Sequence, residues 1–475
     1  MTQTPTQSAT VPGPRGRDGT QAPPKAHAPR RRAWRESSDR VRTAATTEPG
    51  RLRIIGAVLA LLVVAFGAVT AWQIADRQSA AGNVLHHSAP LSADAAEIYS
   101  SLADADATVA GGFLVGGQEP KSVSDSYKKD ISTAAKLITE AAANSAGSPE
   151  ARAQITSLNR QLPVYTELVA TAQADNRQGL PLGGAYLRYA DTQMRKTNGL
   201  LDAADRLYQV ENSRLSDDYS TAKALPYAAW ALGVIALAVL VWAQRRHYRR
   251  TNRVFNQGLL AASAASAVVL LWLVVGHTVA RTQLDNSYAH GAKSIQALNN
   301  ARIAVLQARG DENLTLVARG SGDSYEANYK SGMAKLAGKD PHGVGGQLQQ
   351  ALALADNAKG RAPVETAIKS VQTWRGLHAT ERAKDNDGDY TTAVAVVIGG
   401  KDSEGVPVTA TTAQSFTTVD DQLGQAVLQE QSEFNSAANS GRDALALLPY
   451  GAGLLAVLAA AGAVFGIGRR LSEYR

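Results

Sequence analysis

Four apolar windows divide the chain and leave long polar segments between them. The windows lie at residues 53–74, 225–243, 258–280 and 447–468. Each is close to the roughly 20 residues that an α-helix needs to cross a bilayer. Apart from Arg53 at the first boundary, none of them contains Asp, Glu, Lys or Arg. The pattern predicts four transmembrane helices surrounded by lipid.

The polar segments, residues 75–224 and 281–446, show helical periodicity. Between residues 85 and 109, apolar side chains recur at spacings near three, four and seven. This pattern predicts a long helix that leaves the membrane after the first window. Pro90 lies inside it and is expected to kink it, because proline cannot donate the backbone hydrogen bond of a helix.

Glycine- and proline-rich stretches interrupt the first polar segment three times, at residues 111–120, 145–149 and 178–184. Ser148 is expected to cap the third helix, with Pro149 at its first position. The fourth helix should start at Ala185 and run on into the second window. Four antiparallel helices that each bury one apolar stripe form a bundle. The predicted fold class is therefore an all-α membrane protein with two tandem extracytoplasmic four-helix bundles.

Short sequence matches at a nearly constant offset predict that the second unit duplicates the first. Residues 225–227 and 448–450 both read Leu-Pro-Tyr, and residues 165–172 resemble residues 374–381. Both copies would run in the same direction through the membrane, unlike the inverted repeats of many transporters. The uncharged windows also disfavour a transport pathway, which usually contains intramembrane charge.

The net charge of +7 is concentrated in three places, the tail 1–52, the link 244–257 and the end 469–475. All three lie on the same side of the membrane if every window crosses it. Because loops rich in Lys and Arg stay in the cytoplasm, we expect both termini there. The tail has few large apolar residues and is predicted to be disordered. Basic tails also bind nucleic acid, but attraction to anionic lipid explains the charge, so no nucleic-acid partner is predicted.

The link between the second and third windows is the predicted contact for a cytosolic protein. The cytoplasmic parts are too small to hold a kinase or cyclase, so an output requires a recruited protein. The candidate contact residues are Arg245, Arg246, Arg249, Arg250 and Arg253.

A second candidate contact lies at the end of the bundles farthest from the membrane. Apolar side chains among glycines at an exposed tip favour docking of a partner protein. The candidates are Phe113, Leu114, Leu180, Leu182, Leu316 and Tyr390. The alternative is that these side chains fold inward and cap the core.

No motif for catalysis or cofactor binding stands out. The chain has no cysteine, which excludes disulfides and Cys-ligated metal sites. Residues 385–389, Asp-Asn-Asp-Gly-Asp, resemble a calcium loop but lack the glycine and glutamate positions of an EF-hand, so a turn is preferred. Residues 309–311 spell an Arg-Gly-Asp adhesion tripeptide, a match too short to be informative. We expect no enzymatic activity, no metal and no cofactor.

Two copies of a span, a four-helix segment and a second span, preceded by an Arg-rich tail, resemble the GlnX family of actinobacterial membrane proteins. The stretches that carry the resemblance are residues 174–188 (ADNRQGLPLGGAYLR) and 385–390 (DNDGDY), and the likeness covers about residues 51–475. GlnX is thought to connect an extracytoplasmic amino-acid-binding lipoprotein with cytosolic protein kinase G. The resemblance implies a non-enzymatic relay and transfers no site residues.

With this resemblance, the favoured function is a transmembrane signalling adaptor. It would relay an extracytoplasmic signal of the glutamate, aspartate or glutamine type, through a solute-binding lipoprotein, to a cytosolic Ser/Thr protein kinase. Direct binding of a small ligand and association with a second copy of the chain remain open. The alternative is a structural or assembly protein of the cell envelope, which would show no response to a ligand.

Overall fold

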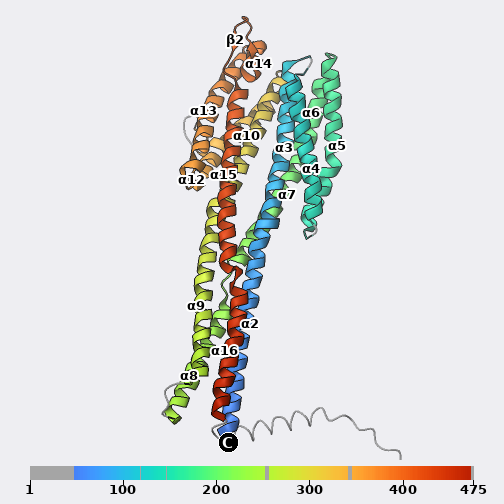
Figure 1. Cartoon of the computed structure of the whole chain (residues 1–475). Helices are drawn as coiled ribbons and strands as arrows, with labels where there is room; N and C mark the ends of the chain where they lie inside the picture. The colour runs from blue at the N-terminus through green and yellow to red at the C-terminus, as the bar shows by residue number, and fades with distance from the viewer. Residues whose placement is uncertain (1–47, 118, 146, 252–255, 341–344, 472–475) are drawn as a thin grey trace, which may run out of the picture.

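The computed structural model describes residues 48–471 except residues 118, 146, 252–255 and 341–344. Most of the predicted tail 1–52 therefore lies outside the described residues. The described chain is predominantly helical and elongated, with a narrow stem below a broader head (Figure 1).

The stem consists of four helices that carry the apolar windows. They are α2 (Glu48–Asn83), α8 (Tyr227–Thr251), α9 (Gln257–Asn286) and α16 (Leu448–Leu471). Helices α8 and α16 each pack against both α2 and α9. Large apolar side chains such as Leu61, Leu271 and Phe465 are exposed on the outside of the stem. Within the described residues, four helical stretches are long and apolar enough to cross a membrane by length and composition, and each contains one stem helix.

Small residues let the stem helices approach one another closely. A Cβ atom added at Gly258 of α9 would lie 2.3 Å from the carbonyl oxygen of Gly462 on α16. A Cβ atom added at Gly67 of α2 would lie 2.1 Å from the Cβ of Ala456 on α16. Such close contacts drive helix association in lipid, where burying apolar surface gains little. Larger side chains at Gly67 or Gly258 would push α16 away from its neighbours.

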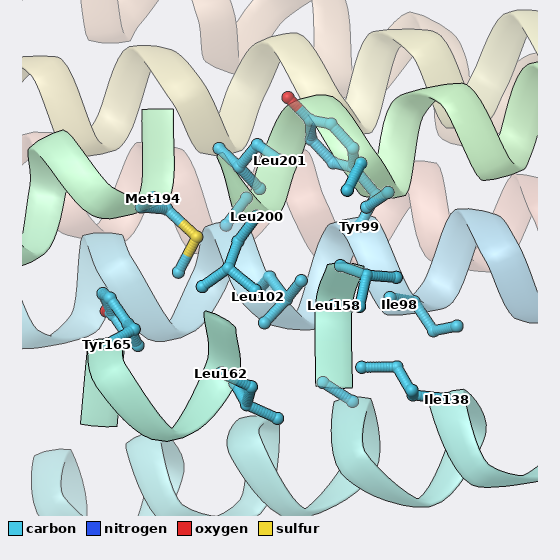
Figure 2. Packing of buried hydrophobic residues seen from close by; sticks show 14 of the residues in the cluster. Ile98, Tyr99, Leu102, Ile138, Leu158, Leu162, Tyr165, Met194, Leu200 and Leu201 are labelled. Atoms are coloured by element: carbon cyan, nitrogen blue, oxygen red, sulfur yellow. The ribbon is translucent and has the colours of Figure 1, made fainter. Parts of the chain in front are cut away.

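The first helix cluster is the half of the head that precedes α8. It contains η1 (Val84–Ser88), α3 (Ala89–Val115), α4 (Lys121–Asn144), α5 (Pro149–Arg177), α6 (Leu182–Arg195) and α7 (Leu200–Ala222). Leu102, Ile138 and Leu158 from three different helices meet in its core (Figure 2). The predicted cap of α5 is confirmed, because the Ser148 hydroxyl accepts a hydrogen bond of 3.1 Å from the Ala151 N–H.

The second helix cluster follows the stem helix α9. It contains η2 (Ser287–Ala292), α10 (Lys293–Val317), α11 (Asp323–Ala337), α12 (Gly346–Leu354), α13 (Ala358–Asn386), α14 (Tyr390–Ile398), β1 (Gly400–Lys401), β2 (Pro407–Val408) and α15 (Thr412–Ala446). Val305, Val371, Trp374 and Leu423 are fully buried in its core. Helix α10 also packs along α3, so its Leu306 belongs to the core of the first cluster. The two clusters are therefore joined along α3 and α10.

Two of the long helices contain a π-helical turn just above the stem. Segment η1 links α2 to α3, and η2 links α9 to α10. At the end of η1, the Ala89 N–H donates to the carbonyl of Val84, one residue farther back than in an α-helix. The predicted kink at Pro90 thus coincides with a widened turn immediately before the proline. The helix then continues to Val115.

The prediction of one continuous fourth helix is wrong. Helix α6 ends at Arg195 and α7 begins only at Leu200. Asn198 between them has a φ of 60°, a left-handed conformation that asparagine tolerates better than most residues. The chain breaks again between α7 and α8, where Pro226 cannot donate a backbone hydrogen bond.

The interruption predicted at residues 111–120 is confirmed, although α3 ends later in it than expected, at Val115, and is followed by Gly116 with a φ of 70°. Gly111 itself lies against α10: a Cβ atom there would be 3.2 Å from the Asn313 amide nitrogen.

The all-α prediction misses a two-stranded antiparallel ribbon, in which Gly400 pairs with Val408 and Lys401 with Pro407. The Asp402 carboxylate organises its turn by accepting hydrogen bonds from the Glu404 and Val406 N–H groups, at 2.9 and 2.8 Å.

Candidate functional site

A buried stretch of charged and polar residues on α10 forms the centre of the candidate site. Arg309, Asp311, Glu312 and Asn313 are all nearly inaccessible to solvent. Helix α10 packs against α3 on one side and against α11, α12 and α15 on others, so even its charged positions are covered. A buried charge is costly unless it is paired and hydrogen-bonded. The partners of these residues therefore define the site.

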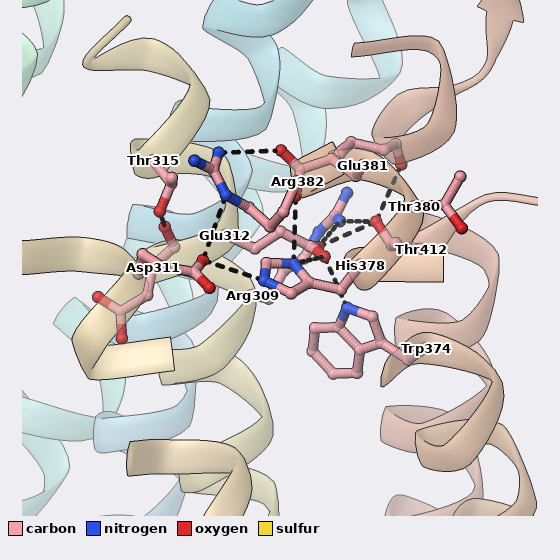
Figure 3. A network of polar contacts seen from close by, with 12 residues as sticks. Arg309, Asp311, Glu312, Thr315, Trp374, His378, Thr380, Glu381, Arg382 and Thr412 are labelled. Carbon is pink, nitrogen blue, oxygen red and sulfur yellow. Dashed lines mark hydrogen bonds and ion pairs between the residues drawn. The ribbon is translucent and has the colours of Figure 1, made fainter. Parts of the chain in front are cut away.

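Glu312 is the acceptor at the centre of the second-cluster half of the site. The Trp374 indole N–H donates to its Oε1 over 2.9 Å, and His378 Nδ1 lies 3.0 Å from the same oxygen. Arg309 and the Thr412 hydroxyl donate to Oε2 over 2.6 and 2.9 Å (Figure 3). Burial alone would raise the pKa of Glu312, but these hydrogen bonds and the nearby positive charge lower it below its ordinary value. The carboxyl is therefore ionised.

His378 is a second cation of this half of the site, beside Arg309. Its Nε2 lies 3.1 Å from a carboxylate oxygen of Glu326, and its ring stacks on Tyr329 with centroids 3.6 Å apart. Burial opposes protonation, but hydrogen bonds to Glu312 and Glu326 raise the pKa of His378 to about 9. Its imidazole is therefore protonated at neutral pH, with both ring nitrogens donating. Burial raises the pKa of the neighbouring Glu381 to about 8, so that carboxyl is mostly neutral.

The first-cluster half of the site has the opposite balance, with one guanidinium among three carboxyl groups. Arg195 of α6 reaches Asp191 at 2.7 Å, Asp311 at 2.9 Å and Asp106 of α3 at 3.3 Å. Burial raises the pKa of all three acids, and their mutual repulsion adds to this. The value reaches about 7 for Asp191 and about 6 for Asp311.

Hydrogen bonds connect the two halves of the site across the α3–α10 contact. The Asn313 amide donates to the Ala107 carbonyl over 3.0 Å. The Tyr325 hydroxyl of α11 donates to Asp191 over 3.2 Å. Together with the Arg195–Asp311 pair, these bonds link the interiors of the two helix clusters. A shift of one cluster against the other would have to break or exchange buried polar contacts.

This buried network is suited to coupling rather than to solute binding, because solvent does not reach Glu312. Within the described part of the chain, no group of three His, Asp or Glu side chains is arranged to hold a metal ion. The calcium-like stretch 385–389 forms a turn, as preferred: Asp389 caps α14 by accepting from the Thr392 N–H over 3.2 Å. The Arg-Gly-Asp tripeptide is buried, so its charged side chains are not available for adhesion.

The predicted apolar docking surface at the tip is wrong for two of its residues. Leu114 and Leu316 are buried together with Ala393 and Val397 of α14, which therefore caps the interior. Phe113 and Tyr390 are partly buried against the same end of the molecule.

Leu180 and Leu182 remain at the surface, with exposed fractions of 43% and 60%. Their role in docking stays a prediction.

The predicted cytoplasmic contact lies at the other end of the molecule. Helix α8 continues to Thr251, so the first half of the predicted link is helical. Arg245 and Arg249 are exposed, and Arg246 lies over the Trp242 ring, 5.4 Å from its centroid. The side chain of Arg250 and all of Arg253 lie outside the described residues.

The buried network was missed by sequence reasoning, although one signal was present. Residues 309–313, Arg-Gly-Asp-Glu-Asn, place polar residues at consecutive positions inside a helix. A helix with one side in solvent would show apolar residues at regular spacing along its buried side. The consecutive polar residues do not follow this spacing, and that departure is the signal.

Comparison with known families points to sensing. Residues 80–220 match the model of the actinobacterial sensor domain family. The match extends from the end of α2 into α7 and so covers the first helix cluster. It fits a sensor-type membrane protein of actinobacteria and indicates a role in sensing or signalling. No curated protein and no solved structure matches the chain significantly.

Proposed function

We propose that the protein is a transmembrane signalling adaptor whose head receives a signal that its stem passes across the membrane. The sensor-domain match and the four apolar helices support this function. A signalling protein also needs a mechanical path from the receiving end to the membrane. The helices that link the head to the stem supply such a path.

The observation that carries the proposal is the continuity of two helices from the stem to the tip. Helix α2 passes through η1 into α3, and α9 passes through η2 into α10 (Figure 1). These two helices also pack against each other in the head, where the buried network holds α10 to α3, α6 and α13. Because packed interfaces have discrete arrangements, a docking event at the tip would shift both helices together. The π-helical turns lie on this path, and such turns are frequent at functional sites.

The finer assignment follows the resemblance to GlnX. The head would lie outside the cytoplasm and bind an amino-acid-loaded lipoprotein, and the basic end of α8 would engage a cytosolic protein kinase. The exposed Leu180 and Leu182 support a docking surface at the tip, and the exposed Arg245 and Arg249 support one at the opposite end. The matching positions of η1 and η2 after α2 and α9 support an internal duplication.

The proposal is tested with the full chain in nanodiscs of neutral lipid. The probe is a purified solute-binding lipoprotein from the same organism, with and without glutamate. We expect glutamate-dependent binding, measured by interferometry, and its loss in Leu182→Asp. Leu428→Asp is the matched control, because Leu428 is a leucine of α15 with an exposed fraction of 72%.

The cellular test measures phosphorylation of the substrates of the kinase after addition of glutamate. Wild type and Leu428→Asp should restore the response to a deletion strain, whereas Leu182→Asp and an Arg245→Gln/Arg249→Gln double variant should not. If neither binding nor phosphorylation depends on the protein, the adaptor proposal fails and a structural role in the envelope is favoured.

A further inference from the structure

A cavity of about 440 Å³ lies where the head meets the stem. It is bordered by the end of α7, the connection to α8, the end of α9 and η2. The lining residues are Ser216, Tyr219, Ser220, Lys223, Ala224, Leu225, Tyr227, Arg281 and Tyr288. The cavity is thus separate from the buried network on α10.

The cavity lies at the level of the expected membrane surface. The apolar stretches of α8 and α9 have their head-side ends here, next to Tyr227 and Arg281. Trp72 and Tyr227 are exposed at the corresponding ends of the stem helices α2 and α8, with exposed fractions of 70% and 67%. Tyr450 at the start of α16 is 79% exposed. Exposed Trp and Tyr at the ends of apolar helices are typical of the layer of lipid head groups.

The polar groups of the cavity favour an anion. Lys223 and Arg281 contribute two positive charges, and both approach Asp285, at 3.0 and 3.7 Å. The Asp285 side chain is about half exposed, so it screens these cations only partly. The Lys223 ammonium is held by the Tyr288 ring, whose centroid is 4.7 Å away.

Helix α7 ends at this cavity, and its free carbonyl groups would repel an anion. Arg77 of α2 adds a positive charge just beyond this end of the helix. Its guanidinium donates to the carbonyl oxygens of Ala224 and Leu225 over 2.6 and 3.1 Å. The carbonyls that follow the helix are therefore neutralised by a third cation, and the side of the cavity formed by Ala224 and Leu225 has positive charge behind it.

We propose that this cavity binds the phosphate group of an anionic phosphate ester, with Lys223 and Arg281 as its ligands. Cations and hydroxyl donors are the groups that bind phosphate oxygens in proteins, and Tyr227 adds a hydroxyl group to the lining. The position at the membrane surface makes the head group of an anionic phospholipid the natural source. A bound phosphate would lie against Tyr288 of η2, so binding of a lipid head group would directly contact one of the two π-helical turns.

The test uses the full chain in nanodiscs of phosphatidylcholine that contain a small fraction of phosphatidylglycerol. Native mass spectrometry counts the phosphatidylglycerol molecules that remain bound after release. We expect Lys223→Gln or Arg281→Gln to reduce retention roughly fivefold, the effect of one basic residue at a membrane surface. Asp285→Asn should increase retention, because it removes the competing carboxylate. A variant that failed to fold would lose retention, so an increase in Asp285→Asn distinguishes an effect on ligand binding from a loss of folding.

Lys136→Gln is the matched control, because Lys136 is an exposed lysine of α4, far along the chain from the cavity. A second arm adds soluble glycerol 3-phosphate to nanodiscs of phosphatidylcholine alone and measures the thermal midpoint. Stabilisation that is lost in Lys223→Gln and enhanced in Asp285→Asn would assign the site to a soluble phosphate ester. The proposal would be overturned if glycerol 3-phosphate had no effect and retention of phosphatidylglycerol were the same in all variants. It would also be overturned if glycerol 3-phosphate had no effect and Lys136→Gln lost as much retention as Lys223→Gln.

Discussion

The carboxyl groups of two neighbouring residues of α10 have pKa values that are shifted in opposite directions. Glu312 has a pKa below its ordinary value although it is fully buried, whereas burial raises the pKa of Asp311 to about 6. The difference lies in the donors. Trp374, His378, Arg309 and Thr412 all surround the one carboxylate of Glu312.

On the other side of α10, Asp106, Asp191 and Asp311 share the cation Arg195, and the Tyr165 and Tyr325 hydroxyls donate to Asp106 and Asp191. The positive charges and donors around each carboxyl group, rather than burial alone, therefore decide the direction in which its pKa is shifted. Glu312 itself stays ionised and anchors the second cluster, although the pKa values of His378 and Glu381 beside it are raised. The Arg195 half can take up or release protons where the two clusters meet, and four substitutions or changes of condition sharpen this contrast.

The largest effect is expected for Glu312→Gln. The substitution keeps the shape but removes the charge that balances the buried Arg309 and His378. Breaking a buried ion pair on one side typically costs about 3–5 kcal/mol, which would lower the midpoint of denaturation in detergent. The control is Glu365→Gln on α13, where an exposed pair with Arg361 should contribute less than about 0.5 kcal/mol.

Arg195→Gln should cost less, about 1–3 kcal/mol, although it removes the shared cation of three buried acids. These acids already have raised pKa values and can become neutral when the guanidinium is absent. The loss should therefore be smaller at pH 5 than at pH 8. An equal loss at both pH values would show that the three acids are as firmly ionised as Glu312.

The stability of the folded protein should fall as the pH rises from 6 to 9. The raised pKa of Asp191, about 7, and of Glu381, about 8, means that folding favours their protonated forms. Their contribution is present at low pH and is lost as the pH rises through those values. His378, with a pKa of about 9, stabilises the fold below pH 6.5 and loses this contribution through pH 9. Thermal midpoints in matched buffers measure the trend, and a midpoint that rises over this range would contradict it.

The smallest effect is expected for Asp191→Asn. An uncharged amide resembles the protonated carboxyl that the site already favours, so the stability at pH 5 should change by less than about 1 kcal/mol. The decline in stability between pH 5 and pH 8 should become shallower than in wild type. An unchanged slope would mean that Asp191 does not titrate in this interval.

Local features of the fold could be predicted from the sequence, and the network could not. The apolar windows and the Ser148 cap depend on residues close together in the chain. Glu312 and His378 are 66 positions apart, and Arg195 and Asp311 are 116 apart. Their pairing exists only because α10 packs between α3 and the rest of the second cluster. The same packing buries Leu114 and Leu316, although the local sequence predicts that they lie at an exposed tip.

The adaptor function requires the head and the basic end of α8 to lie on opposite sides of the membrane. Because the chain contains no cysteine, a single introduced cysteine reports only its own position. Leu182→Cys and Arg249→Cys place the reporter on exposed residues of the head and of α8. In intact cells, a membrane-impermeant maleimide should label Leu182→Cys, and it should label Arg249→Cys only after permeabilisation. Labelling of Arg249→Cys in intact cells, with Leu182→Cys protected, would contradict the account.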